Sequence, residues 1–115
     1  MTLSDIRDLL DAEVLCGDAF LDREAHSACA SDFMSDALAY VKDQAILLTG
    51  MVNPQVIRTA DMMDMKCIVF VRGKRPDEGM LALAKERGMV VMATAKPMYP
   101  SCGELYLNGL RGSGL

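Results

Sequence analysis

At 115 residues, with 51% hydrophobic and 24% charged residues, the chain has the composition of an ordinary soluble protein, and we expect a single domain over residues 1–115. A net charge of −4 and the lack of Trp argue against nucleic acid and acidic membrane surfaces as partners. No apolar stretch approaches the ~20 residues of a membrane span, and the acidic N-terminal segment is unlike a signal peptide, so a cytoplasmic location is expected.

The first predicted elements are a helix over residues 3–11 and a strand over residues 13–16. Thr2 is a favourable cap for this helix, and Asp5 stands three residues later, as in a capping box. Apolar side chains recur along the helix at the spacing of one face. The chain therefore begins with a small helix–strand unit.

The next segment is less regular and is rich in small residues. Residues 25–31 alternate small side chains, and we expect a strand whose two faces let another backbone approach closely. Asp32 and Asp36 bracket a predicted helical turn, which residues 37–41 extend.

Three apolar runs in the remaining sequence predict buried strands. They cover residues 45–49, 67–71 and 89–93, are unbroken by polar residues apart from one terminal Thr, and include β-branched side chains. A strand with only one buried face would alternate apolar and polar residues instead. These runs therefore predict strands with both faces covered.

Helices are predicted between these strands. Asn53 and Pro54 provide a cap and a first-turn proline for a helix that ends near Asp64. In the following connection, Pro76 is expected at the first helical position, and Gly88 is the expected left-handed stop. The result is two overlapping strand–helix–strand units, which imply parallel strands joined by right-handed crossovers.

A last helix is predicted from Pro100 to Asn108-Gly109, and residues 111–115 are expected to form a frayed tail. Strands and helices thus alternate along most of the chain. We therefore expect an α/β fold of three layers, with a largely parallel β-sheet flanked by helices.

Motifs of several enzyme and cofactor classes are absent from the sequence. There is no GxxxxGK[ST] phosphate-binding loop, no GxGxxG dinucleotide motif and no GxSxG nucleophile motif. The four Cys include no CxxC pair, and with His26 as the single histidine we expect no zinc site. We expect the thiols to be buried and reduced, and the ten Met to serve as adaptable core or interface residues.

Two loops at the ends of predicted parallel strands are candidates for an anion site. One carries three cations, Arg72, Lys74 and Arg75, directly before a helix. The other runs from Thr49 to Asn53 and leads into the preceding helix. Open α/β sheets bind ligands at this edge, and helix N-termini attract anions. Solvated cations on an exposed turn and simple helix capping at Asn53 are the alternative explanation of these residues, and both interpretations are kept.

Several segments together resemble the DRTGG domain family. They are Asp22-Arg23, the small-residue strand with the stretch ASDFMSD at 30–36, the strand that ends in Thr49-Gly50, the helix led by Asn53, the strand that ends at Gly73, and the helix start Pro76-Asp77-Glu78. Asp22-Arg23 match the motif that gives the family its name, whereas His26-Ser27-Ala28 stand where Thr-Gly-Gly is expected. The motif positions that the resemblance transfers are Asp22, Arg23, Ser31 and Asp32. Local roles for them, an Asp22–Arg23 pair and a helix cap at Asp32, are the alternative.

The resemblance implies an accessory domain and not an enzyme. DRTGG domains accompany CBS-domain pyrophosphatases and phosphotransacetylases, and they are similar to the N-terminal domain of HPr kinase, which lacks the kinase chemistry. Members tend to form homodimers, and some short versions are associated with iron-hydrogenase gene clusters. We therefore expect a non-catalytic regulatory or assembly module that is homodimeric and senses a small anionic ligand such as an adenine nucleotide.

Two other functions stay open from the sequence. One is a small metal-assisted transferase or hydrolase that uses Asp22, Asp32 or His26. The other is an accessory protein of an iron hydrogenase or another redox system, with a redox enzyme as its partner.

Overall fold

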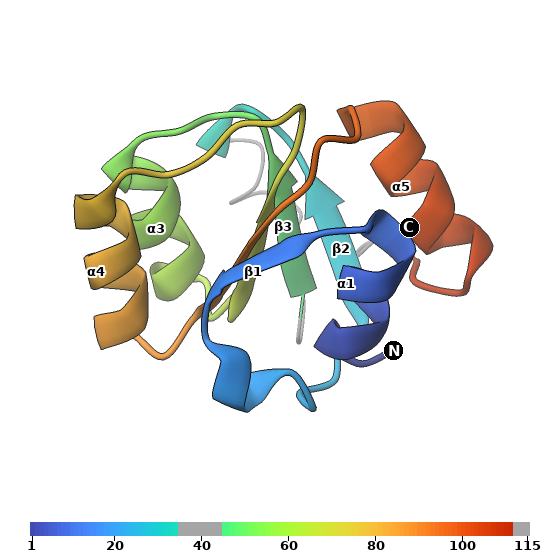
Figure 1. The fold of residues 1–115 in the computed structure, drawn as a ribbon, viewed down its shortest axis with the longest axis horizontal. Coiled ribbons are helices and arrows are strands. Elements are labelled where there is room, and N and C mark those ends of the chain that lie inside the picture. Colours follow the sequence, from blue (N-terminus) through green and yellow to red (C-terminus); the bar gives the residue numbers. More distant parts are fainter. Residues whose placement is uncertain (35–44, 112–115) are drawn as a thin grey trace.

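The structure, a computed structural model, describes residues 1–34 and 45–111 of the chain (Figure 1). Its elements in chain order are α1 (Leu3–Leu10), β1 (Glu13–Cys16), the 3-10 turn η1 (Asp18–Phe20), β2 (Ser27–Ala30), β3 (Ala45–Thr49), α3 (Pro54–Met62), β4 (Cys67–Phe70), α4 (Glu78–Glu86), β5 (Val90–Ala93) and α5 (Met98–Leu107). The helical turn predicted between Asp32 and Asp36, together with its extension over residues 37–41, lies outside the described residues from residue 35 onward.

The described strands form one sheet in the order β1-β5-β4-β3-β2. The four strands from β2 to β5 are parallel neighbours, and β1 joins the sheet as an antiparallel edge strand beside β5. Each parallel step moves in the same direction across the sheet, as successive right-handed crossovers require. The predicted α/β fold with a largely parallel sheet is confirmed.

Helices cover both faces of this sheet, so the three predicted layers are present. Figure 1 shows α3 and α4 on one side of the sheet and α1 and α5 on the other. Successive side chains of a strand point to opposite faces, so β3 and β4 contribute to two separate cores. Leu47 and Phe70 pack under α3 and α4, whereas Leu48 and Val69 pack under α1 and α5.

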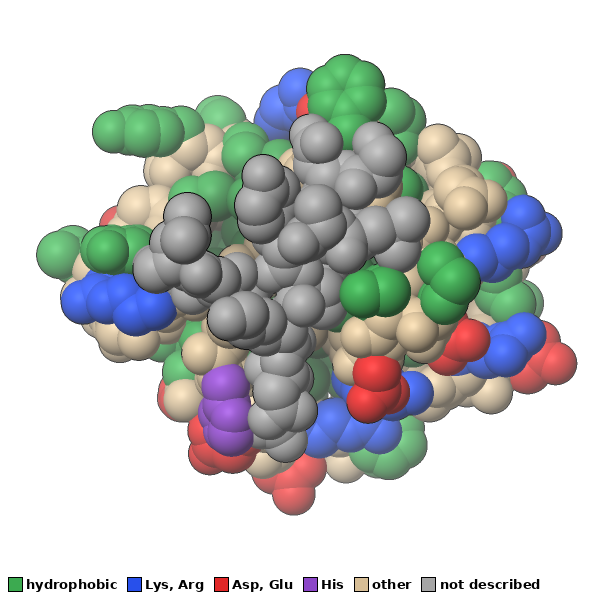
Figure 2. All heavy atoms as spheres, turned by 180° about the vertical axis from the view of Figure 1, so that it is seen from behind, with side chains coloured by type: hydrophobic (Ala, Val, Ile, Leu, Met, Phe, Trp, Pro, Cys, Tyr) green, Lys and Arg blue, Asp and Glu red, His purple; other side chains and the backbone are tan. Residues whose placement is uncertain are grey.

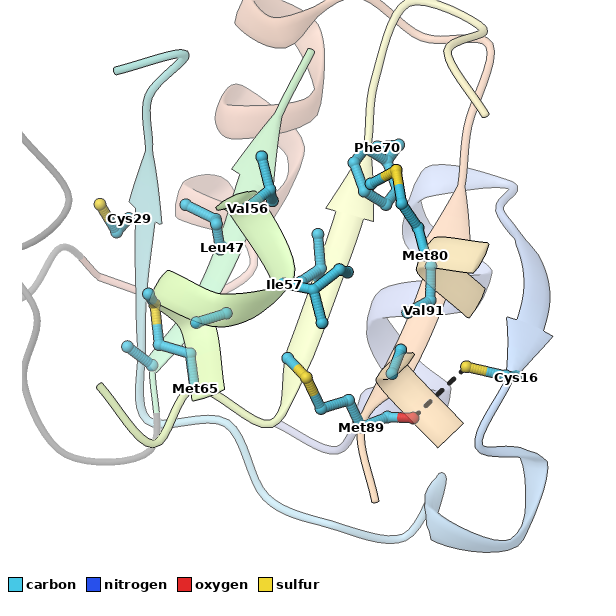
Figure 3. Packing of buried hydrophobic residues seen from close by; sticks show 14 residues of the cluster. Cys16, Cys29, Leu47, Val56, Ile57, Met65, Phe70, Met80, Met89 and Val91 are labelled. Atoms are coloured by element: carbon cyan, nitrogen blue, oxygen red, sulfur yellow. Dashed lines mark hydrogen bonds between the residues drawn. The ribbon is translucent and has the colours of Figure 1, made fainter. Parts of the chain in front are cut away.

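The core under α3 and α4 is built from apolar side chains of unequal size. In Figure 3, Ile57 of α3 and Met80 of α4 point toward the strands, close to Phe70 and Val91. All four side chains are buried. Burial of each such side chain contributes roughly 1.5–3 kcal/mol. The central strands therefore form a stable frame whose ends can hold a site.

The predicted start of α4 is wrong by two residues. Pro76 precedes the helix, and Asp77 is the N-cap, since its carboxylate accepts a hydrogen bond of 2.8 Å from the amide of Met80. Asp77 has an extended backbone (φ −80°, ψ 175°), as an N-cap residue requires. The capping carboxylate, and not the proline, decides where α4 begins.

The C-terminal part also departs from the prediction. Helix α5 begins at Met98, and Pro100 lies inside its first turn, where a proline lacks no hydrogen bond that the helix needs. Arg111 is not frayed: its carbonyl accepts a hydrogen bond of 3.2 Å from Ala28, and its guanidinium stacks on Tyr106. The strands predicted at 25–31, 67–71 and 89–93 are shorter by one to three residues.

None of the helices within residues 1–34 and 45–111 has the length and apolar character needed to cross a bilayer.

Candidate functional site

The carboxyl ends of the parallel strands bring polar residues from three strands together. Asp32 follows β2, Thr49 ends β3, and Arg72 follows β4. Strands β2, β3 and β4 are adjacent in the sheet, so these residues meet at one edge although 40 positions separate Asp32 from Arg72. The fold therefore creates this cluster, which we call the carboxyl-edge site.

The carboxylate of Asp32 is the centre of the carboxyl-edge site. One of its oxygens, Oδ1, accepts hydrogen bonds from the amide of Gly50 at 2.7 Å and from the hydroxyl of Thr49 at 3.4 Å. The other oxygen, Oδ2, lies 3.2 Å from Nη2 of Arg72 and forms an ion pair with it. Three kinds of donor, an amide, a hydroxyl and a guanidinium, thus surround one carboxylate.

The hydroxyl of Thr49 is held in place from its other side. Its oxygen accepts a hydrogen bond of 3.1 Å from the amide of Met51, which leaves the hydroxyl hydrogen for Asp32. Thr49 is fully buried, and a buried hydroxyl without partners would be destabilising. The Thr49 side chain therefore connects the end of β3 to Asp32.

Arg72 reaches Asp32 from a tight turn with an unusual backbone. Arg72 and Gly73 both have positive φ, 62° and 72°, and the amide of Lys74 closes the turn on the carbonyl of Val71 at 3.1 Å. A left-handed conformation costs a residue other than glycine roughly 1–2 kcal/mol. The amides of Arg72 and Gly73 offset this cost through hydrogen bonds of 2.9 and 3.0 Å to the loop that follows β5.

Gly50 provides the space that the guanidinium of Arg72 occupies. A Cβ on Gly50 would lie 2.6 Å from Cζ of Arg72, far inside van der Waals contact, and would overlap the nearer guanidinium nitrogen. The backbone of Gly50 does not lie in the left-handed region, so the glycine is needed for space and not for conformation.

The donors of the carboxyl-edge site match the chemistry of an oxyanion site. Guanidinium groups and backbone amides bind carboxylate and phosphate oxygens with similar geometry. In the structure the bound oxyanion is the protein's own Asp32. An external phosphate or carboxylate would meet the same donors after displacing that side chain.

The other residues of the two predicted anion loops are directed elsewhere. Asn53 caps α3, because its side-chain oxygen accepts a hydrogen bond of 3.3 Å from the amide of Val56. Arg75 forms an ion pair of 2.6 Å with Glu13 on β1, the outer strand of the sheet that is farthest from β2. Lys74 is exposed and has no ion-pair partner among the residues that the structure describes. The three predicted cations thus do not converge on one point.

Ser31 forms a local turn beside Asp32. Its hydroxyl makes 3.0 Å hydrogen bonds to both the amide and the carbonyl of Phe33. This turn sets the direction in which the chain leaves β2. Ser31 thereby supports Asp32 without a direct bond to Arg72.

Arg23 lies near the amino-terminal ends of the parallel strands, opposite Asp32, which lies at their carboxyl ends. Its Nη1 donates a hydrogen bond of 2.7 Å to the carbonyl of Gly88, and its guanidinium stacks 4.0 Å from the centre of the Phe20 ring. Asp22 is exposed and forms no ion pair with Arg23, although both residues are described, so a local Asp22–Arg23 pair is not present. Arg23 instead joins the segment before β2 to the start of β5.

The residues named for a metal-assisted enzyme are not assembled into a cluster. Asp22 and Asp32 lie at opposite ends of β2, and His26 is exposed before that strand. Within residues 1–34 and 45–111, no three His, Cys, Asp or Glu side chains are placed to share a metal ion.

All four cysteines lie within the described residues, and none of them forms a disulfide bond. Cys16, Cys29 and Cys67 are buried, and Cys102 is half-buried. Burial raises the pKa of the Cys67 thiol to about 12, and it raises the pKa of Cys16 and Cys102 as well. Cys16 also lies 3.5 Å from the carbonyl of Met89, to which it donates (Figure 3). A protonated thiol is a poor nucleophile, so these positions favour packing over redox chemistry.

Sequence reasoning placed Gly50 in a candidate anion loop without naming it as a site residue, and it missed the Asp32–Arg72 pair. The available signal for Gly50 was a glycine directly after a buried strand, at the edge where parallel sheets bind ligands. The pair itself had no local signal, because it depends on the order of the strands.

Comparison with known proteins agrees with this fold. A family model described as DRTGG domain matches residues 5–102. The crystal structure of the CBS and DRTGG domains of the regulatory region of Clostridium perfringens pyrophosphatase, complexed with the activator diadenosine tetraphosphate, matches with a TM-score of 0.71 and 15% identity. The match covers 90% of this chain and 45% of that chain, so this chain spans less than half of the matched protein. No curated protein sequence is significantly similar.

Proposed function

Because the chain belongs to the DRTGG domain family, we propose that it is a non-catalytic regulatory or assembly module that senses a small anionic ligand such as an adenine nucleotide. The structurally similar domain comes from a regulatory region crystallised with a nucleotide activator. That likeness supports a regulatory role and makes adenine nucleotides the first ligands to test.

The observation that carries the proposal is the carboxylate of Asp32 within its three donors. A phosphate oxygen of the ligand would replace this carboxylate and bind the guanidinium of Arg72 and the amide of Gly50. Arg72 offers a planar pair of donors that suits two phosphate oxygens at once. Lys74, two residues later and exposed, would contribute a second positive charge.

Replacement of the Asp32 carboxylate by a ligand oxygen would make ligand binding a conformational switch. The Asp32 bonds tie the end of β2 to the ends of β3 and β4. The Asp32–Arg72 pair is partly exposed, at 35% and 46% of the two side chains, so its net stabilisation is about 0–1 kcal/mol and a ligand can displace it. Release of Asp32 would change how the chain leaves β2, and a partner protein would detect that change.

Isothermal titration calorimetry with ATP, ADP, AMP and inorganic phosphate tests the ligand. We expect binding of at least one nucleotide to the unmodified protein and a loss of at least tenfold in affinity for Arg72→Gln. Arg87→Gln is the matched control, because Arg87 pairs with Asp61 across α3 and α4, away from the carboxyl-edge site. Absence of binding, or equal losses in both variants, would contradict the proposal.

We also propose that the module is a homodimer and that α5 forms the contact. Tyr99 and Leu107 on this helix are 88% and 82% exposed, which is unusual for apolar side chains of this size. Figure 2 shows hydrophobic side chains at the margin of the molecule that carries α5. Gly103 lies midway between them, four residues from each, with open space where a side chain would be.

The equal spacing of Tyr99, Gly103 and Leu107 allows α5 of one copy to pack against α5 of a second copy. A second copy that crosses α5 in the antiparallel direction at Gly103 would place Tyr99 of each copy against Leu107 of the other, as a two-fold contact requires. Size-exclusion chromatography with light scattering should give the mass of a dimer at tens of micromolar. Leu107→Glu should give a monomer, and exposed Met62→Glu on α3 should leave the dimer intact. A monomeric unmodified protein would overturn the dimer proposal alone.

A further inference from the structure

A cavity of about 450 Å³ lies at the amino-terminal edge of the parallel strands, opposite the carboxyl-edge site. Its volume is within the range of pockets that hold small molecules. The residues that line it come from the start of α1, the segment before β2, and the starts of β3 and β4. It is therefore separate from the groups around Asp32.

The floor of this cavity is apolar. Leu3, Ala45, Ile46 and Cys67 line it, and each belongs to one of the two buried cores of the protein, with at most 2% of its surface exposed. Ile46 and Cys67 are direct neighbours across β3 and β4. The floor is therefore already shielded from water, and it offers van der Waals contacts to an apolar ligand body.

Two cations reach the rim of the cavity, Arg23 and Lys66. The guanidinium of Arg23 uses Nη1 for the carbonyl of Gly88, and a guanidinium has further N–H donors. Arg23 and Cys67 both line the cavity. Burial raises the pKa of the Cys67 thiol, and the positive charge of Arg23 lowers it in part. Lys66 Nζ is 3.3 Å from Asp64, whose side chain is 85% exposed, so this pair is readily exchanged in solvent.

Two acids also stand on the rim, Glu24 and Asp64. Among the lining residues, these two acids balance the charges of Arg23 and Lys66, and Glu24 is itself paired at 3.0 Å with the N-terminal ammonium of Met1. Figure 2 shows acidic and basic side chains interspersed along the lower edge of the molecule, where the parallel strands begin. The several negative charges of a polyphosphate would outnumber the two cations of the rim, whereas Arg23 and Lys66 can together neutralise the single charge of one carboxylate.

We propose that this cavity binds a small monocarboxylate with an apolar body, its carboxylate between Arg23 and Lys66 and its body on the floor formed by Leu3, Ile46 and Cys67. The ligand differs in class from the nucleotide proposed for the carboxyl-edge site. The two sites share no residue, so this proposal stands or falls independently of the first.

Titration of the ¹⁵N-labelled protein, followed by amide chemical shifts, tests the cavity. The probes are sodium benzoate and sodium hexanoate, with benzamide and hexanamide as neutral counterparts and inorganic phosphate as an anion without an apolar body. We expect saturable shifts at the amides of Ile46 and Cys67 with both carboxylates, and at least tenfold weaker binding of the amides and of phosphate. Equal binding of the neutral amides or of phosphate would overturn the proposal, and so would the absence of saturable shifts.

Variants of the two cations locate the carboxylate. Lys66→Gln should weaken benzoate binding at least tenfold, whereas Lys85→Gln on α4 should leave it unchanged. Arg23→Gln is informative if the protein still folds, but Lys66→Gln decides the matter because Lys66 is half-exposed and its loss leaves no buried group unpaired. Unchanged affinity in Lys66→Gln would contradict the proposal. Arg72→Gln should keep benzoate binding, which separates this cavity from the nucleotide site.

Discussion

At the scale of single residues, Gly50 and Arg72 determine whether the carboxyl-edge site can form. Gly50 is the position where the guanidinium passes over the backbone, and the left-handed turn at Arg72 aims that guanidinium toward Asp32. Taken separately, Gly50 is an ordinary glycine after a strand, and Arg72 is a residue in a strained turn. Together they hold a positive charge over the end of a neighbouring strand.

Gly50→Ala should therefore remove the Arg72–Asp32 pair without removing a charge. The added methyl group displaces a flexible guanidinium and not backbone, so the free energy of unfolding should fall by only about 1 kcal/mol. Nucleotide affinity should fall as far as in Arg72→Gln. Urea unfolding and calorimetry measure the two effects.

Gly79→Ala is the matched control for that experiment. Gly79 lies in α4, and a Cβ there would meet only the Asp77 carboxylate, at an ordinary 3.4 Å. Alanine is favoured over glycine in helices by ~1 kcal/mol, so stability should be equal or higher and nucleotide affinity unchanged. Wild-type nucleotide affinity in Gly50→Ala would show that the position of the guanidinium is unimportant.

The buried thiol of Cys67 makes the free energy of unfolding vary with pH in the alkaline range. Its pKa is about 12 in the folded protein against an ordinary value of 9.0, so between these values the folded state keeps a proton that the unfolded state loses. The stabilisation is complete below about pH 9 and is lost as pH rises toward 12, with a slope of at most about 1.4 kcal/mol per pH unit. Urea unfolding from pH 8 to 10.5 should show a smaller loss in Cys67→Ala than in the unmodified protein. Parallel losses in the two proteins would contradict this cause.

At the scale of elements, the local sequence determined the strands and the start of α3 but not the starts of α4 and α5. The strands were predictable because unbroken apolar runs such as Cys67–Phe70 have both faces covered, and Asn53 identified the start of α3 by its cap. The starts of α4 and α5 were misplaced because proline is tolerated before a helix and throughout its first turn. Pro76 and Pro100 therefore mark the neighbourhood of a helix start and not its first residue.

The cap of α4 gives a direct check on this point. Asp77→Ala should lower the free energy of unfolding by about 1 kcal/mol, because the amide of Met80 loses its acceptor. Pro76→Ala should change it by less than about 0.5 kcal/mol, since Pro76 lies outside the helix. Thermal or urea unfolding of the two variants measures both effects. A larger loss in Pro76→Ala would show that the proline, and not the aspartate, sets the start of α4.

At the scale of the whole molecule, the order of the strands decides which residues meet. Arg72 and Arg75 are three residues apart, yet Arg72 pairs with Asp32 beyond β3 while Arg75 pairs with Glu13 on β1 at the far edge. No local pattern distinguishes these two arginines. The sequence predicted that cations would lie at the carboxyl edge, but their partners follow from the order β1-β5-β4-β3-β2.

The same order places two different chemistries at the two edges of one sheet. The carboxyl edge holds the Asp32 carboxylate within its donors, and the amino edge holds the cavity beside Arg23. The family motif residue Arg23 therefore lies far along the strands from the residues that we assign to the nucleotide. A module with two separate sites could respond to two ligands.

The central claim is that the carboxylate of Asp32 occupies the place of a ligand oxyanion, and the affinity of Asp32→Asn for nucleotide tests it most directly. The amide side chain has nearly the same shape but no negative charge, so it competes less for Arg72 and does not repel a phosphate. Calorimetry should show nucleotide affinity about tenfold higher than in the unmodified protein, equivalent to about 1.4 kcal/mol. An unchanged or lower affinity in Asp32→Asn, with the fold intact, would contradict the account.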